Sequence, residues 1–378
     1  MPTTRRLTTY PMAFLRLPAT RSGQVGLGVM AVVALPIALS IGLGQRGDDR
    51  LVFSYATYHP RFWDGDCVCP APVATDDLLV FCGGNGWKDQ TRLVAVDRRT
   101  KQEVWRQLRP SGCGALRVIG GVISLWDGRE LSAFNTGGST LWTRGDVVGL
   151  PFEVDGRVFL SAGTSSALLV VDPRNGTSVD EIPIPERPDG TPLIDGNTIT
   201  YGTHSGRLVS LNLMDRTATV ATVATRILSP LVRHGSLLVF NAEVASGFSL
   251  IAYDVARAEV RWSVDTRTLS QATPLIDGEW VYYGADRLYA VRLATGAART
   301  YALAEGPVGT PVMHDGIMYV AGGRFLHALD PATGVVRWRF AANEWINAPA
   351  TTGPPVLRDN VLYFGSLDCR VYGIRAGP

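Results

Sequence analysis

The stretch GTPVMHDGIMYVAGGRFLHALDPATGVVRWRF, from Gly309 to Phe340, contains the parts of one small antiparallel sheet. Asp315-Gly316 is a two-residue turn of the kind that needs positive φ, and apolar runs flank it. The segment LHALD (Leu326 to Asp330) follows as a third strand, and a Pro-Ala-Thr-Gly turn separates it from a fourth strand that begins near Trp338. The stretch therefore predicts four short strands joined by tight turns.

The third-strand element of this unit recurs along the chain. Its eight copies begin at Leu93, Leu131, Leu168, Leu208, Leu250, Leu288, Leu326 and Val371. Successive starts lie 37 to 45 residues apart, which is the length of one four-stranded propeller blade. The chain of 378 residues is thus predicted to contain one all-β, eight-bladed β-propeller rather than several layered domains.

Four tryptophans stand near the start of fourth strands, at Trp105, Trp142, Trp262 and Trp338. Repeated aromatic residues usually bury the faces of blades. We therefore expect these side chains to pack between neighbouring blades rather than to stack on a ligand.

The last repeat reaches only its third strand before Pro378. A ring with an incomplete blade would leave an unpaired strand edge, which is a liability. The segment LVFSYATY (51–58) is a suitable missing strand. We expect it to pair with the third strand of the last blade, so that the propeller spans residues 51–378.

The N-terminal region differs from the repeats in composition. A basic leader (1–23) precedes the segment 24–44, which contains no charged residue and is long enough to cross a bilayer as a helix. We expect a transmembrane signal anchor, with a cleaved signal peptide ending near Ala38 or Ser40 as the alternative. The basic leader should stay in the cytoplasm. The propeller would then face the extracytoplasmic side of the cell membrane on a single-pass protein.

Charge and motifs exclude several function classes. The formal net charge is +2 and 19% of the residues are charged, with both signs mixed along the chain, so no basic face for nucleic acid is expected. No Ser-His-Asp order, phosphate-cradling glycine loop or pair of catalytic carboxylates stands out. The sequence gives no catalytic residue, and an enzyme is the less favoured reading.

The repeat unit resembles the pyrroloquinoline-quinone-type propeller repeat over almost all of residues 72–375. Blades three and four lack the tryptophan, and Arg292 replaces the strand-ending Asp of blade six. The resemblance implies the fold but not the cofactor, because quinoprotein alcohol dehydrogenases share the repeat with non-catalytic relatives. Among the latter are the sensor domains of some membrane kinases and the propeller lipoprotein of the bacterial outer-membrane protein assembly machinery.

The cysteines distinguish these two branches of the family resemblance. Quinoprotein dehydrogenases carry a vicinal Cys-Cys disulfide over the quinone and a Glu/Asn/Asp set for calcium, whereas the closest pair here, Cys67 and Cys69, has a residue between them. The resemblance therefore favours a non-catalytic scaffold or sensor that uses no cofactor. The alternative is a reduced quinoprotein dehydrogenase using pyrroloquinoline quinone and calcium.

The repeat places all five cysteines on one face of the ring, near the closure seam. Disulfides in an oxidising compartment explain this grouping more simply than a metal site, because a zinc site usually has paired C-x₂-C elements or histidines. We expect Cys82 to pair with Cys113, and Cys369 to pair with Cys67 or Cys69.

The same face carries two longer loops, at 83–91 and 241–249. Loops on a rigid scaffold often carry binding function. Trp87, Lys88 and Asp89 are the candidate contact residues for a protein or polymer partner. The alternative is a solvated loop whose tryptophan packs on its own blade.

Overall fold

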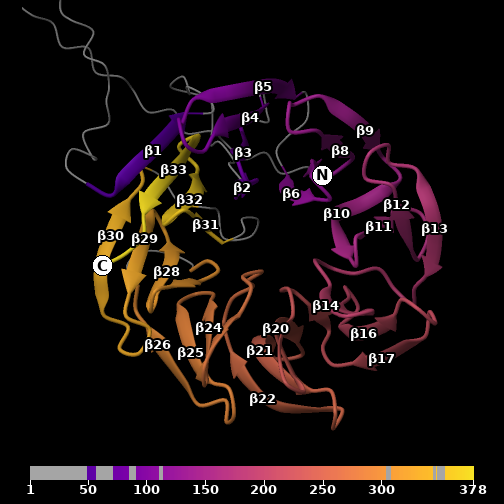
Figure 1. Cartoon of the computed structure of the whole chain (residues 1–378). Helices are drawn as coiled ribbons and strands as arrows, with labels where there is room; N and C mark the ends of the chain where they lie inside the picture. The colour runs from indigo at the N-terminus through magenta and orange to yellow at the C-terminus, as the bar shows by residue number, and fades with distance from the viewer. Residues whose placement is uncertain are drawn as a thin grey trace, which may run out of the picture. The chain divides into compact units, whose positions relative to one another are not determined.

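The computed structural model describes residues 49–56, 71–84, 91–109, 114–303, 308–343, 346 and 354–378. In this part of the chain, eight antiparallel sheets follow one another around a ring (Figure 1). The predicted eight-bladed propeller is confirmed. The expected membrane segment 24–44 lies outside the described residues, and within them no helix is long and apolar enough to cross a membrane.

The first four blades follow the chain in order. Blade 1 consists of β2 (Val73–Ala74), β3 (Leu78–Gly83), β4 (Thr91–Asp97) and β5 (Glu103–Arg109). Blade 2 consists of β6 (Ala115–Ile119), β7 (Val122–Trp126), β8 (Leu131–Phe134) and β9 (Thr140–Arg144). Blade 3 consists of β10 (Val147–Val154), β11 (Arg157–Ala162), β12 (Ala167–Val171) and β13 (Ser178–Pro183). Blade 4 consists of β14 (Leu193–Asp195), β15 (Thr198–Gly202), β16 (Arg207–Asn212) and β17 (Ala218–Thr222).

The other four blades complete the ring. Blade 5 consists of β18 (Arg226–Ile227), β19 (Val232–His234), β20 (Leu237–Val244), β21 (Gly247–Asp254) and β22 (Glu259–Asp265). Blade 6 consists of β23 (Leu275–Asp277), β24 (Trp280–Gly284), β25 (Leu288–Arg292) and β26 (Ala298–Tyr301). Blade 7 consists of β27 (Val312–His314), β28 (Ile317–Gly322), β29 (Phe325–Leu329) and β30 (Val336–Ala341). Blade 8 consists of β31 (Val356–Arg358), β32 (Val361–Ser366), β33 (Arg370–Arg375) and β1 (Leu51–Ala56).

Blade 5 departs from the four-strand pattern because its first strand is divided in two. Both β18 and β19 pair with β20. Pro230 lies between them, and proline has no N–H to donate to a strand ladder. The ladder is therefore interrupted at this point, while the blade keeps the same order of strands.

The ring closes through the strand from the start of the propeller. β1 pairs antiparallel with β33, from Leu51 opposite Ile374 to Ala56 opposite Arg370. The expected pairing of this segment with the last blade is thus present from Leu51 to Ala56, and residues 57–58 lie outside the described part of the chain. Edge-on ring contacts join β1 to blade 1 and to the other strands of blade 8. The Phe53 ring centroid lies 6.4 Å from that of Phe81 and 6.2 Å from that of Tyr363.

The four repeated tryptophans connect neighbouring blades, as expected. The indole Nε1 of Trp105 donates to the carbonyl of Thr136 at 2.8 Å, and that of Trp142 donates to the carbonyl of Pro173 at 2.8 Å. Trp262 donates to Leu293 at 2.7 Å and Trp338 donates to Gly377 at 2.8 Å in the same way. Each acceptor lies after the third strand of the following blade, so each tryptophan fixes its own blade to the next one.

Candidate functional site

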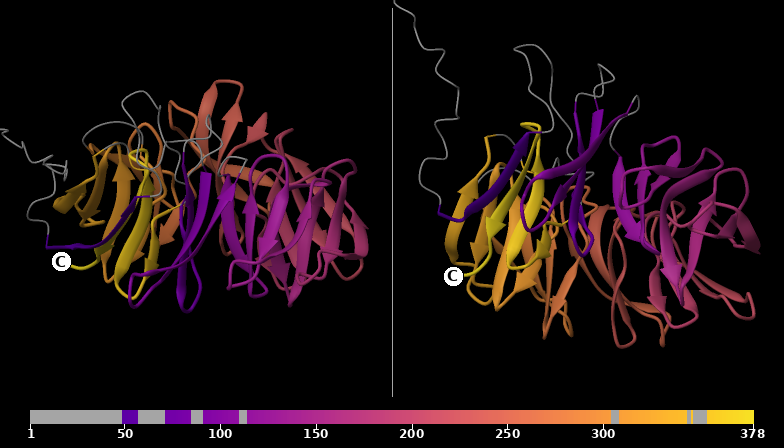
Figure 2. Two further views of the ribbon diagram at one scale, coloured as in Figure 1. Left: turned by 90° about the horizontal axis from the view of Figure 1, so that it is seen from above. Right: turned by 45° about the horizontal axis from the view of Figure 1, so that its top comes forward.

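The propeller has two faces that differ in their connections. The turns from first to second strand and from third to fourth strand lie on one face, which we call the turn face. The turns from second to third strand and the connections between blades lie on the other, which we call the loop face. Figure 2 shows the β20–β21 hairpin of blade 5 standing above its neighbours on the loop face.

The sequence analysis was wrong about the segment 241–249, which is a hairpin rather than a loop. The ladder between β20 and β21 runs without a break from Leu237 opposite Asp254 to Val244 opposite Gly247. Only Ala245 and Ser246 lie outside the two strands, and Gly247 has a φ of 132° that suits the tight turn. Backbone hydrogen bonds therefore hold this projection rigid. Trp87, Lys88 and Asp89 lie outside the described residues, so their role stays a prediction.

Charged side chains of blade 4 meet blade 5 on the loop face. A carboxylate oxygen of Asp189 lies 3.5 Å from a guanidinium nitrogen of Arg226, which comes from β18, and 3.5 Å from Nδ1 of His204. His204 is well exposed, with 73% of its side chain accessible. Together with Glu186 and Arg207, these residues form what we call the blade-4 patch.

Glu186 completes the acidic part of the blade-4 patch. Its carboxylate accepts a hydrogen bond from the Ser205 hydroxyl at 2.5 Å and lies 3.8 Å from Arg207. Burial opposes ionisation of Glu186, but hydrogen bonds from Ser205 and Thr203 outweigh it and lower the pKa of the carboxyl group. Glu186 is therefore a fixed negative charge beside exposed positive ones.

The geometry of the blade-4 patch suits recognition rather than nucleophilic catalysis. The Ser205 hydroxyl is directed to Glu186, while His204 faces Asp189, so no serine–histidine pair is formed. Fixed charges of both signs on an exposed surface can complement a partner protein. Sequence reasoning missed these residues because they come from separate segments, although the charged, proline-containing connection PERPD (185–189) was a usable signal.

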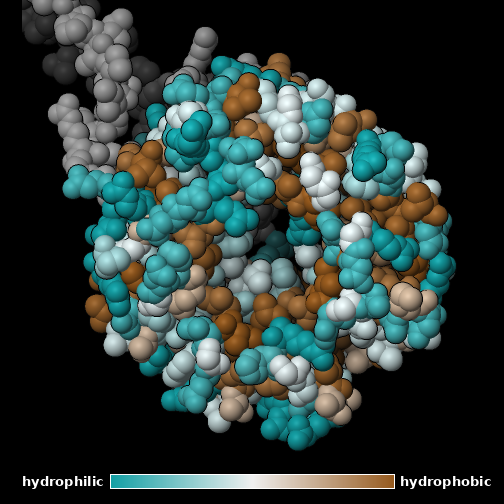
Figure 3. Space-filling model, in the orientation of Figure 1, coloured by the Kyte–Doolittle hydropathy of each residue, from teal (hydrophilic) through white to brown (hydrophobic). Residues whose placement is uncertain are grey.

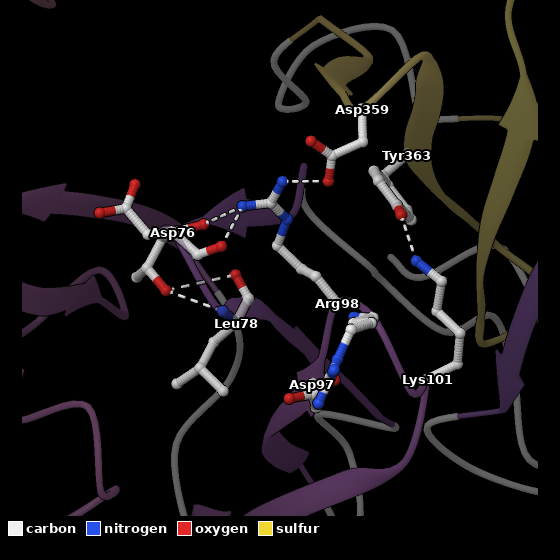
Figure 4. Close-up of polar contacts among 9 residues, drawn as sticks. Asp76, Leu78, Asp97, Arg98, Lys101, Asp359 and Tyr363 are labelled. Atoms are coloured by element: carbon white, nitrogen blue, oxygen red, sulfur yellow. Dashed lines mark hydrogen bonds and ion pairs between the residues drawn. The ribbon is translucent and has the colours of Figure 1, made fainter.

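A second polar cluster lies on the turn face, where blade 1 meets blade 8 (Figure 4). Arg98 donates to the carbonyls of Thr75, at 2.6 Å, and of Asp76, and it forms an ion pair with Asp359. Lys101 donates to the hydroxyl of Tyr363 at 2.7 Å. These hydrogen bonds and this ion pair hold blade 1 against blade 8, where the ring closes. We therefore regard the cluster as structural rather than as a functional site.

Two of the five cysteines are described. Cys82, in β3, and Cys369, just before β33, are both buried, and both are disulfide-bonded. Cys67, Cys69 and Cys113 lie outside the described residues, so the expected pairings stay predictions. Within the described ranges, no group of three or more His, Cys, Asp or Glu side chains could hold a metal ion.

Fold and repeat together define an eight-bladed propeller of the pyrroloquinoline-quinone-like repeat class. The family of outer membrane protein assembly factor BamB matches residues 89–301 and 298–377, and the chain belongs to this family. No curated protein sequence was found to match.

Two solved structures share the fold. BamB from Moraxella catarrhalis is 17% identical, with a TM-score of 0.62 over 86% of this chain and 99% of that chain. The computationally designed Ika8 protein is 14% identical, with a TM-score of 0.61 over 83% of this chain and 98% of the designed one. At these identities the likeness extends to the fold alone.

Proposed function

We propose that this chain is a non-catalytic scaffold of the cell envelope that binds another protein through its loop face. The observation that carries the proposal is the blade-4 patch, an exposed group of fixed charges beside the rigid β20–β21 hairpin. Membership of a family described as an outer membrane protein assembly factor supports a role in binding proteins at a membrane.

The hairpin and the patch form one continuous contact surface. Arg226 pairs in the strand ladder with Glu243 of β20, while its guanidinium reaches Asp189 of blade 4. The base of the hairpin is therefore tied to the patch. A partner would meet a preformed surface, which lowers the conformational entropy lost on binding.

Site-specific photo-cross-linking tests this proposal in cells. A photoreactive residue at Ser246, at the tip of the hairpin, should form adducts with one discrete protein. Met214, which is 72% exposed in the turn after β16, lies on the turn face and provides the control position. The Asp189→Arg change should weaken the Ser246 adduct by reversing a charge of the patch. Equal labelling at Ser246 and Met214, or no adduct at Ser246, would contradict the proposal.

We further propose that segment 24–44 tethers the propeller to the cell membrane on the extracytoplasmic side. The disulfide-bonded state of Cys82 and Cys369 supports an oxidising compartment. Alkylation of cells without reductant should leave both cysteines unmodified, and removal of residues 1–44 should release the propeller from the membrane fraction. Two alkylated thiols in intact cells would place the propeller on the reducing side.

A further inference from the structure

Arg117 lies on the inner wall of the ring and connects three blades. It belongs to β6, the first strand of blade 2. One guanidinium nitrogen donates to the carbonyl of Pro151 in β10 of blade 3 at 3.0 Å. The other terminal nitrogen donates to Oγ1 of Thr191, just before β14 of blade 4, at 2.7 Å. A side chain that spans the first strands of three successive blades must lie along the wall of the central hollow seen in Figure 3.

The charge of Arg117 has only neutral partners in this place. Burial lowers the pKa of its guanidinium, and no carboxylate of the described residues counteracts that effect. Other arginines of the ring differ, since Arg144 lies 2.5 Å from Asp146 and Arg233 lies 2.7 Å from Asp195. A partly buried cation without a counterion is costly, and such groups are concentrated at binding sites.

The local chemistry points to an oxyanion as the missing counterion. A guanidinium has five N–H donors in a planar fork, and the two contacts of Arg117 use two of them. The Thr191 hydroxyl accepts one of these bonds and keeps its own hydrogen for a second acceptor. We propose that the inner wall of blades 2–4 binds a carboxylate or phosphate group through Arg117 and Thr191. This site is independent of the proposed loop-face function.

A direct measurement uses the full-length protein labelled with ¹⁵N-arginine. Inorganic phosphate and acetate are titrated separately at constant ionic strength set with chloride, and the Arg117 Nε–H signal is followed by NMR. We expect a saturable shift of this signal with at least one of the two anions. A response to phosphate alone would identify a phosphate group as the ligand, and a response to both would identify any oxyanion. No saturable shift with either anion would overturn the proposal and leave Arg117 as a strut between blades.

Variants separate binding from structural effects. Arg117→Gln keeps hydrogen-bond donors but removes the charge, and we expect anion binding measured by calorimetry to weaken at least about tenfold, or ~1.4 kcal/mol. Arg261→Gln is the matched control, because Arg261 is exposed and lies 3.2 Å from Glu259 on the outer strand β22. If Arg117→Gln does not fold, Arg117→Lys replaces it, since it keeps the charge but loses the fork geometry. Unchanged affinity in the folded Arg117 variant would refute the site.

Discussion

His327 allows a quantitative test of how the ring is packed. It lies in β29, is 2% exposed, and neither ring nitrogen has a hydrogen-bond partner. Blades 6 and 8 have tyrosines at the corresponding position, and Tyr289 and Tyr372 each donate to an aspartate in the preceding turn. Blade 7 has Gly323 and Arg324 in that turn. Blade 7 therefore has no aspartate in this turn, and the histidine that stands at the tyrosine position lacks a hydrogen-bond partner.

Burial, with a smaller effect of the Arg339 charge, lowers the pKa of His327 from 6.5 to about 4. Between these two values the unfolded chain holds a proton on the imidazole that the folded chain excludes. Stability therefore falls as the pH drops below 6.5, and the loss is complete below pH 4. At 1.36 kcal/mol per pKa unit, the full loss is roughly 3 kcal/mol, of which about 2 kcal/mol is reached at pH 5.

Guanidinium denaturation of the wild type and of His327→Leu at pH 7.5 and pH 5 measures this effect. Leucine fills a similar volume without polar atoms, so the variant should be at least as stable as the wild type at pH 7.5. Between the two pH values the wild type should lose about 2 kcal/mol more than the variant.

The control is His204→Gln, because His204 is exposed on the loop face whereas His327 is buried in the ring. An equal loss of stability in the wild type and His327→Leu would refute the reasoning. It would show that the imidazole is hydrated or protonated in the folded ring.

Three further perturbations address the joints of the ring. Trp262→Ala removes a side chain that is 8% exposed and should cost about 3–5 kcal/mol in the free energy of unfolding, whereas Leu141→Ala, at a position 38% exposed, should cost much less. Phe53→Ala should cost a similar 3–5 kcal/mol and raise the rate of proteolysis within β1, with Val104→Ala as the exposed control; unchanged proteolysis would argue against β1 as the closing strand. Reduction of the disulfides that contain Cys82 and Cys369 should lower the free energy of unfolding by about 2–4 kcal/mol, and a melting temperature that does not change with reductant would contradict this expectation.

The fold could be predicted because its signals are local and repeated. The Asp-Gly turns illustrate this point. Positive φ is found at Asp155-Gly156 (48° and 74°) and at Asp315-Gly316 (47° and 70°), as a tight hairpin turn requires. At Asp195-Gly196 and Asp277-Gly278, only the glycines have positive φ. Turn chemistry and strand period together determine the blade, and the blade number follows from counting.

The functional surface could be predicted only in part. The loop face was the expected binding face, but the residues that meet there come from different blades. Asp189, His204 and Arg226 meet only after blades 4 and 5 have packed. The β20–β21 hairpin was read as a loop because Glu243 and Ser246 interrupt its apolar pattern. Backbone pairing overrides such an interruption when both strands continue together.

A regular pairing of an aromatic side chain with a glycine explains which junctions of the ring are alike. Gly138, Gly176 and Gly296 all have positive φ, and a Cβ atom at any of them would lie 2.6–2.7 Å from the facing tryptophan. After blade 6, Tyr301 takes the place of the tryptophan and covers Gly334. A side chain at the turn and an aromatic ring in the previous blade exclude each other, so the two positions must change together.

At blade 4, both the turn glycine and the facing aromatic residue of the previous blade are replaced. The turn glycine is replaced by Arg216 (φ 61°) in blade 4 and by Ala258 (φ 55°) in blade 5. Asp180 of blade 3 meets Arg216 at 2.9 Å instead of an aromatic contact, and an exposed ion pair contributes little, at about 0–1 kcal/mol. The buried hydrophobic cores on either side of blade 4, with Tyr201 in one and Phe240 in the other, must therefore determine its position. The Asp189–Arg226 pair crosses the junction of blades 4 and 5 on the loop face, so a partner bound there would reinforce a junction that lacks the repeated aromatic–glycine contact.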